Sequence, residues 1–280
     1  MASEEVAGTL QSAVSQGDPM SRSARVIALA NQKGGVAKTT TTVNLAVALR
    51  EHGRRVLVVD LDPQSNLSMS QGIDVESLDV TMFDVLVHGR SIADVVHVRE
   101  VDVAAAGIEL AGAELALSSM MGRERALQRA LAPIKGAYDD ILIDTPPSLG
   151  LLSINAMVAS DGVIVPVQCE YLSLRGLAQL QNTLAQVREH LNPNVDILGI
   201  LPTMFDSRTV HGREALDLLR DSFGPVVFNT RIGKTVRFAE APVSGKSVLA
   251  YDPSGQGARW YRRLALEVMA RESNPVRIAA

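Results

Sequence analysis

The adjacent residues Lys38 and Thr39 have the chemistry needed to hold a polyphosphate. A lysine can reach the β and γ phosphates of a nucleotide, and a neighbouring hydroxyl can bind Mg²⁺. Gly34 and Gly35 come just before the pair. Glycine lets backbone N–H groups approach phosphate oxygens closely. These residue types predict a phosphate-binding loop with a magnesium ion.

The spacing of this segment departs from the usual motif G-x-x-x-x-G-K-[ST]. That motif requires glycines at positions 32 and 37, where this chain has Gln32 and Ala37, and it has an additional lysine, Lys33. On these residues alone, a glycine turn that merely joins a strand to a helix remains an alternative.

Two apolar segments that end in carboxylates support the first interpretation. Residues 56–60 end in Asp60, with Asp62 two positions later, and residues 141–144 end in Asp144. Ligands of open parallel sheets bind at the carboxyl ends of the strands, where these acids would emerge. A carboxylate after an aliphatic run is costly to bury unless it faces a cation, and Mg²⁺ is a suitable one. A helix cap or a turn former is the alternative role for each acid.

The elements around the loop must bring these groups together. Residues 25–30 are typical of a short buried strand, and residues 38–50 of a helix with few charges. Unpaired N–H groups and the helix dipole converge where such a strand, turn and helix meet. Similar apolar runs alternate with helical stretches along the chain. We therefore predict one α/β domain with a doubly wound, mainly parallel sheet flanked by helices.

Composition sets the limits of this domain. The chain has 280 residues, of which 46% are hydrophobic and 21% charged, and its net charge is −4. This charge excludes a uniformly basic nucleic-acid binder but allows a local basic patch. The first 23 residues are rich in Ser, Gly, Gln and Ala. We expect a flexible tail over 1–24, one folded domain over 25–271 and a second tail over 272–280.

The same composition bears on location and cysteine chemistry. The start of the chain lacks a secretory pattern, and no segment offers about 18 uninterrupted apolar residues. We expect a cytoplasmic protein. The chain has one cysteine, Cys169, which excludes an internal disulfide framework. We expect Cys169 to be an unreactive core residue.

Residues 33–40, which read KGGVAKTT, resemble the deviant Walker A box of the ParA/MinD ATPases, a class of P-loop NTPases. The resemblance covers roughly residues 25–271 and is closest to the chromosomal ParA (Soj) branch. Further matching segments are residues 59–64 (VDLDPQ), 143–148 (IDTPPS), 166–170 (PVQCE) and 236–242 (VRFAEAP).

The resemblance implies ATP and Mg²⁺ as cofactors and a role for each site residue. Lys33 would reach across a nucleotide-sandwich dimer to the phosphates of the other subunit, and Asp62 would position the attacking water. Asp144 would hold Mg²⁺ through water, Thr39 would bind it, and Asp60 would support the metal. The phosphate-wrapping residues would be Gly34, Gly35, Val36, Ala37, Lys38, Thr39 and Thr40, with Lys38 on the β and γ oxygens.

One departure from the family concerns Ala37, where glycine is usual. A Cβ atom there restricts the backbone if the position needs a positive φ. Because the position leads into a helix, where alanine is favoured, we expect nucleotide binding to survive and turnover to differ.

A second departure concerns a possible DNA-binding patch. Between positions 205 and 246 there are seven basic and five acidic residues, a net charge of +2, which by itself is a weak signal. ParA dimers bind DNA without sequence preference, and the resemblance points to Arg208 and Arg237, with Arg231 and Lys234 less directly supported. Soj-like proteins often read Ile-Pro-Arg-Asn before the Val-Arg pair, where residues 231–235 here read RIGKT.

The resemblance implies a dimerising ATPase that associates with the nucleoid and is stimulated by a ParB-like centromere-binding partner. Its output would be chromosome or plasmid partitioning. A MinD-like membrane ATPase is an alternative, but residues 271–280 contain Pro275 and little apolar area, so we expect no membrane contact. A cargo-positioning ATPase and a small-molecule kinase or synthetase with the same core are two further candidates.

Overall fold

A computed structural model describes residues 23–169 and 173–273. Within these ranges seven strands form one sheet in the order β3-β4-β2-β5-β1-β6-β7. All neighbouring strands are parallel except β3 and β4. The strands are β1 (Arg25–Leu29), β2 (Val56–Asp60), β3 (Val96–Val98), β4 (Asp102–Ala104), β5 (Asp140–Asp144), β6 (Gly162–Gln168) and β7 (Ile197–Thr203).

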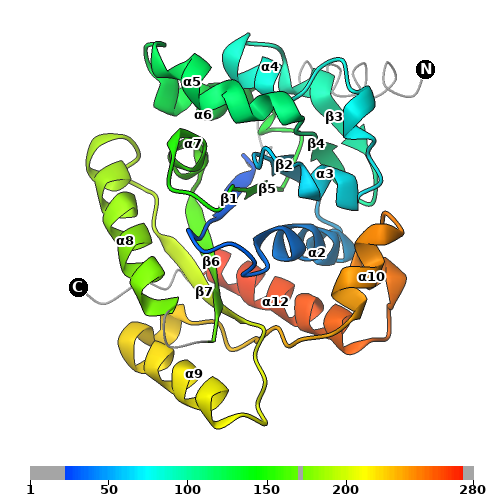
Figure 1. Ribbon diagram of the computed structural model, residues 1–280, viewed down its shortest axis with the longest axis vertical. Coiled ribbons are helices and arrows are strands. Elements are labelled where there is room, and N and C mark those ends of the chain that lie inside the picture. The colour runs from blue at the N-terminus through cyan, green and yellow to red at the C-terminus, as the bar shows by residue number, and fades with distance from the viewer. Residues whose placement is uncertain (1–22, 170–172, 274–280) are drawn as a thin grey trace.

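Helices cover both faces of this sheet (Figure 1). One apolar cluster packs α2 and α12 against one face, and a second packs α4 to α8 against the other. The prediction of a doubly wound, mainly parallel α/β sheet is therefore confirmed. The helices are α2 (Lys38–Glu51), α3 (Asn66–Ser70), α4 (Met82–Val87), α5 (Ala113–Ser118), α6 (Ala126–Leu131), α7 (Leu151–Ala159), α8 (Ser173–His190), α9 (Val210–Phe223), α10 (Arg237–Val243), α11 (Val248–Tyr251) and α12 (Gln256–Ser273).

The central strands are apolar because helices bury both of their faces. Every residue of β2 and of β5 is buried. In the register of the sheet, Asp144 lies opposite Leu29 on one side and opposite Asp60 on the other. The predicted acids therefore emerge side by side at the carboxyl ends of β2 and β5. In the sheet, β2 and β5 lie on one side of β1, and β6 and β7 lie on the other. The direction in which the chain adds strands therefore reverses at β1, and the carboxyl end of β1 is the switch point of the topology.

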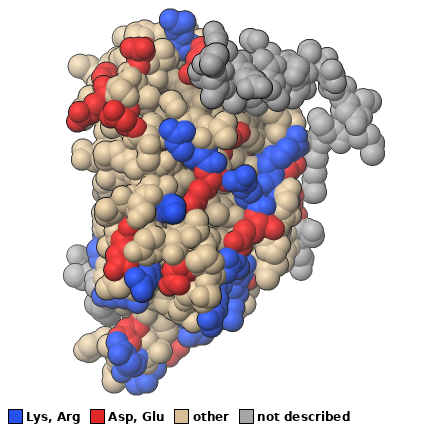
Figure 2. Space-filling model, turned by 90° about the vertical axis from the view of Figure 1, so that its right-hand side faces the viewer, with Lys and Arg blue, Asp and Glu red and all other residues tan. Residues whose placement is uncertain are grey.

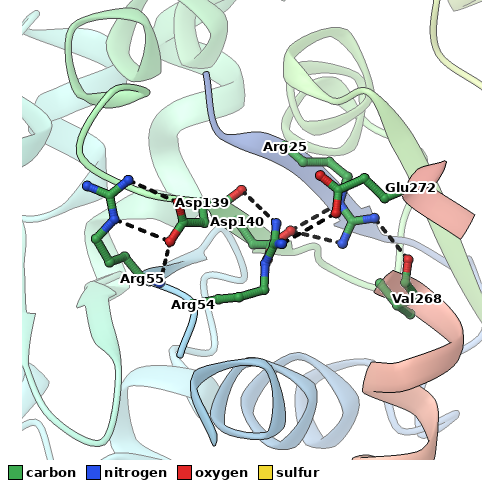
Figure 3. Close-up of polar contacts among 7 residues, drawn as sticks. All are labelled: Arg25, Arg54, Arg55, Asp139, Asp140, Val268 and Glu272. Carbon is green, nitrogen blue, oxygen red and sulfur yellow. Dashed lines mark hydrogen bonds and ion pairs between the residues drawn. The ribbon is translucent and has the colours of Figure 1, made fainter. Parts of the chain in front are cut away.

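The opposite ends of the central strands are held by an ion network (Figure 3). Asp140, the fully buried first residue of β5, accepts a 3.0 Å hydrogen bond from Nε of Arg25 and also pairs with Arg54. Arg25 donates a second bond to the carbonyl of Val268, and Arg54 lies 3.4 Å from Glu272. Since Val268 and Glu272 belong to α12, the network ties the last helix to the start of three strands.

The observed elements match the predicted ranges closely at the site and less closely at the ends. The strand predicted over 56–60 and the start of the helix at Lys38 are confirmed. Helix α12 continues to Ser273, two residues beyond the predicted domain end. The predicted tails lie outside the described residues, apart from positions 23–24 and 272–273. Ala24 is buried, and its N–H donates to the carbonyl of Lys135.

None of the described helices has the length and apolar character needed to span a bilayer.

Candidate nucleotide site

A cavity of about 490 Å³ opens at the carboxyl ends of the central strands. It is large enough for a nucleotide-sized ligand. Seven of the sequence-predicted site residues line it, namely Gly34, Gly35, Ala37, Lys38, Thr39, Thr40 and Asp62. The structure therefore brings the predicted phosphate loop and one predicted acid to a single cavity.

Two buried side chains that the sequence analysis did not single out hold the loop in place. Asn31 donates from Nδ2 to the carbonyl of Pro166 at 2.7 Å and accepts from the N–H of Lys33 at 3.0 Å. Thr203, at the end of β7, donates to the carbonyl of Val36 at 3.1 Å. Val36 is itself buried and does not line the cavity, so it contributes through its backbone. The loop is thus fixed by contacts to β6 and β7.

Ala37 has a left-handed backbone conformation, with φ 69° and ψ 34°. It occupies the N-cap position of α2, one residue before the helix begins. The helix preference of alanine therefore does not apply to it, which corrects that part of the sequence argument. The left-handed region costs an L-residue about 1–2 kcal/mol. The departure from glycine at this position is a source of local strain in the loop.

Asp144 is the central acid of the site. Its Oδ2 accepts a 2.6 Å hydrogen bond from the hydroxyl of Thr39, and its Oδ1 accepts a 3.3 Å bond from the hydroxyl of Thr42. Complete burial, together with the neighbouring charge of Asp60, raises the pKa of Asp144 to about 8. A buried carboxylate of this kind is stabilised when a cation comes close to it.

Asp60 faces a different set of partners. It accepts hydrogen bonds from the N–H and the hydroxyl of Ser68, at 3.0 and 2.7 Å, and from the N–H of Asp62 at 3.1 Å. Burial raises its pKa to about 6, and these bonds work in the opposite direction. Asp60 does not line the cavity. Its hydrogen bonds hold the segment from Asp62 to α3 in place.

Lys38 and Asp62 bring opposite charges to the cavity. Lys38 is nearly buried, and burial lowers the pKa of its ammonium while Asp144 and Asp62 raise it. Asp62 is 8% exposed, and its Oδ1 accepts from the N–H of Gln64 at 3.0 Å. A negatively charged ligand would compensate the desolvated ammonium of Lys38.

Lys33 is separated from this group. Its side chain is exposed, and its ammonium donates to Oε1 of Gln168, at the end of β6, at 3.1 Å. It is not among the residues that line the cavity. Lys33 therefore contacts the end of β6, and the expectation that it serves a second subunit stays a prediction.

The donor set near Asp144 fits a magnesium ion. Hard oxygen ligands are available from the hydroxyl of Thr39 and the carboxylate of Asp144, which already contact each other. Among residues 23–169 and 173–273, no three His, Cys, Asp or Glu side chains gather into a metal site. Mg²⁺ normally keeps several waters and takes phosphate oxygens as ligands, so few protein ligands are needed.

The remaining wall of the cavity comes from segments that the sequence analysis did not assign to the nucleotide site. One of these residues, Met204, has a left-handed φ of 52°. The other wall residues are Val43, Asn44, Gln64, Asn66, Ser70, Pro147, Phe238, Ala241, Pro242, Lys246 and Val248. These residues come from α2, α3, α10 and α11 and from nearby loops, so sequence spacing could not assemble them.

The four candidate DNA-binding residues are partly engaged by acids and aromatic rings. Arg208 is highly exposed and pairs with Asp206 at 2.8 Å, and Arg237 pairs with Glu240 at 2.6 Å. Arg231 is half-buried, with its guanidinium over the ring of Phe205, while Lys234 is exposed. On the face that carries α10, basic and acidic side chains are interleaved (Figure 2).

Cys169 follows β6 and is partly buried. Burial raises the pKa of its thiol to about 11, and Arg231 acts weakly in the opposite direction. The thiol is therefore protonated at neutral pH and a poor nucleophile. The expected core position is not confirmed, because Cys169 is only partly buried.

Comparison with known proteins agrees with this geometry. A family model described as an AAA domain matches residues 24–197. The sporulation initiation inhibitor protein Soj of Bacillus subtilis is 47% identical, over 88% of this chain and 98% of Soj. The chromosome partitioning protein ParA of Caulobacter vibrioides is 44% identical, over 89% of this chain and 95% of ParA.

A solved structure is similar along nearly the whole chain. It is that of cobyrinic acid a,c-diamide synthase from Mycobacterium smegmatis with bound ADP and magnesium. The two chains are 40% identical with a TM-score of 0.81, and the match covers 92% of this chain and 98% of the other. From the phosphate loop, the sheet topology and these similarities together, the chain belongs to the ParA/MinD family of P-loop ATPases.

Proposed function

We propose that this protein is an ATP-dependent dimerising switch that binds DNA without sequence preference and drives chromosome or plasmid partitioning. A ParB-like partner stimulates ATP hydrolysis and resets the switch. The main support is that the chain spans 98% of Soj at 47% identity. In addition, the cavity extends from the phosphate loop to α10, the helix that begins at Arg237.

The chemistry of the proposed reaction follows from the positions of the site residues. The N–H groups of residues 34–40 and the ammonium of Lys38 bind and neutralise the triphosphate. Thr39 and Asp144 would hold Mg²⁺, and the ion would supply positive charge to the phosphate chain. Asp62, at the edge of the cavity, orients the attacking water. Since hydrolysis depends on positioning and charge neutralisation, the lone subunit turns over slowly.

Dimerisation supplies what the single subunit lacks. Lys33 is exposed, contacts Gln168 and is not among the residues that line the cavity. In a face-to-face dimer this lysine reaches the phosphates bound by the other subunit and adds a positive charge there. Two basic patches then lie on one particle, and avidity converts weak DNA contacts into tight binding. ATP holds the two subunits together, and its hydrolysis separates the subunits and releases the DNA.

The decisive experiment compares wild type with Lys38→Ala on a non-specific DNA duplex. Binding is measured with ATP, ADP or no nucleotide, at low and moderate salt. We expect binding only with ATP, a steep loss with salt, and no binding by the variant. An ATP-bound dimer that ignores DNA would contradict the proposal and favour a cargo-positioning role.

A second candidate function is that of an ATP-dependent synthetase, and the name of the Mycobacterium smegmatis structure favours it. In such an enzyme ATP reacts with a small acid, whereas in the proposed switch its hydrolysis sets the lifetime of the dimer. The two functions are distinguished by measuring ADP release with DNA and with a set of small carboxylic acids plus an amide donor. Turnover that requires an acid and yields an amide would support the synthetase.

A further inference from the structure

We propose that Lys246 is a further nucleotide-binding residue and that it contacts the phosphate chain from the side opposite the phosphate loop. The inference rests on the proposed ATP site and adds to it a residue from the turn between α10 and α11. Lys246 lines the same cavity as Lys38 and Thr39, although about two hundred positions separate them in the chain.

The turn that carries Lys246 is anchored to the phosphate-binding helix. Asn44, on α2, is 5% exposed. Its Oδ1 accepts from the N–H of Val248 at 2.7 Å, and its Nδ2 donates to the carbonyl of Thr40 at 2.6 Å. A buried amide with both ends bonded fixes the geometry of the groups that it joins. Asn44 therefore holds the start of α11 at a set place beside α2.

Two further contacts fix the backbone around Lys246. The N–H of Ser247 donates to a carboxylate oxygen of Glu100 at 3.0 Å. Gly245 has a φ of 65° and packs against Gly72, so that a Cβ atom added to Gly245 would lie 3.3 Å from the Cα of Gly72. The backbone on both sides of Lys246 is thus fixed, and its exposed side chain starts from a defined point in the wall of the cavity.

The charge environment of Lys246 suits an anion. Its backbone N–H donates to the carbonyl of Ala241, and no acidic side chain of the described residues pairs with its ammonium. Among the described residues that line the cavity, Asp62 is the one acid, and Gln64, Asn66 and Ser70 are neutral. Asn44 lies six residues beyond Lys38, which is about 9 Å along the helix. A lysine stem is long and flexible, so an ammonium based near Asn44 can reach a phosphate chain that starts at the helix N-terminus.

The test measures equilibrium binding of Mg-ATP, Mg-ADP and adenosine to Lys246→Gln, with Lys135→Gln as a control outside the cavity. We expect Lys246→Gln to bind both nucleotides about tenfold more weakly, as for loss of a hydrogen bond to a charged group. Adenosine affinity and the thermal transition without nucleotide should not change, and Lys246→Arg should keep most of the affinity. Lys135→Gln should behave like wild type.

A double-mutant cycle tests the positioning role of Asn44. If Asn44 acts through Lys246, the loss of ATP affinity in Asn44→Ala and that in Lys246→Gln should not add in the double variant. A merely structural role of Asn44 would give additive losses.

Three outcomes would overturn the inference. The first is unchanged ATP affinity in Lys246→Gln. The second is an equal loss for adenosine, which would assign the lysine to the base or ribose. The third is a loss confined to DNA binding. Failure of wild type to bind ATP would instead refute the proposed function, so the two failures are distinguishable.

Discussion

The hydroxyl of Thr39 donates a 2.6 Å hydrogen bond to Oδ2 of Asp144, and this contact joins the phosphate loop to the end of β5. The two residues are two of the three metal-binding residues that the resemblance implied, the third being Asp60. Asp144 is fully buried, and hydroxyl donors from α2 stabilise its carboxyl group. The contact therefore places a hydroxyl oxygen and a carboxyl oxygen together where the proposed Mg²⁺ would bind.

Replacing Ala37 by glycine should stabilise the protein. The substitution removes the strain of a left-handed alanine, which outweighs the greater entropy of glycine in the unfolded chain. We expect a gain of about 0.5–1 kcal/mol, or roughly 2 °C in Tm. The control is Ala239→Gly inside α10, which should lower Tm because it weakens a helix. A lower Tm for both variants would contradict this account, and unchanged nucleotide affinity and turnover in Ala37→Gly would exclude a tuning role.

Asp144→Asn should raise Tm in the absence of nucleotide and Mg²⁺, and the gain should depend on pH. The pKa of Asp144 is raised to about 8 by burial, so the folded state holds its proton more tightly than the unfolded chain. Wild type is therefore penalised progressively as pH rises from about 4 to about 8, whereas the amide does not titrate.

The measurement is the Tm difference between Asp144→Asn and wild type from pH 5 to pH 9. We expect it to grow to on the order of 5 °C near pH 8 and then level off. A difference that is constant over this range would mean that the pKa of the carboxyl is not raised.

Asp140→Ala should be strongly destabilising, and Asp139→Ala only slightly so. Asp140 is fully buried between Arg25 and Arg54, and its loss removes the carboxylate that both guanidinium groups share, leaving Arg54 with its 3.4 Å ion pair to Glu272. We expect a cost of about 3 kcal/mol. The neighbouring pair of Asp139 and Arg55 is partly exposed and should contribute less than about 1 kcal/mol. Urea titration measures both, and equal costs would refute the assigned role of the buried network.

The sequence predicted those parts of the site that are local in the chain. The loop, the start of α2 and the acids at the ends of β2 and β5 follow from short apolar runs with a fixed polar residue at the end. The sequence did not decide whether Ala37 has a left-handed φ, because alanine also has a high helix preference and the position leads into a helix. The wall that contains Asn44, Lys246 and Val248 was missed, because its contacts join segments about two hundred residues apart.

The predicted DNA patch was equally hard to evaluate from sequence, since charge counting does not show pairing. Arg237 lies 2.6 Å from Glu240 and 3.7 Å from Asp252, so acids of its own chain already occupy it. A DNA phosphate must compete with them. This competition yields a prediction with opposite signs for two neighbouring residues.

Arg237→Ala should weaken ATP-dependent binding to a non-specific duplex and reduce the slope of log K against log salt by about 1. Glu240→Gln should instead strengthen binding, because it removes a competitor for the same guanidinium without touching the cavity. Arg188→Ala is the control, since Arg188, near the end of α8, makes a similar exposed pair with Asp196 and should leave the slope unchanged. If Arg237→Ala and Arg188→Ala behave alike, or if Glu240→Gln weakens binding, Arg237 does not contact DNA and the patch must be sought elsewhere on the surface.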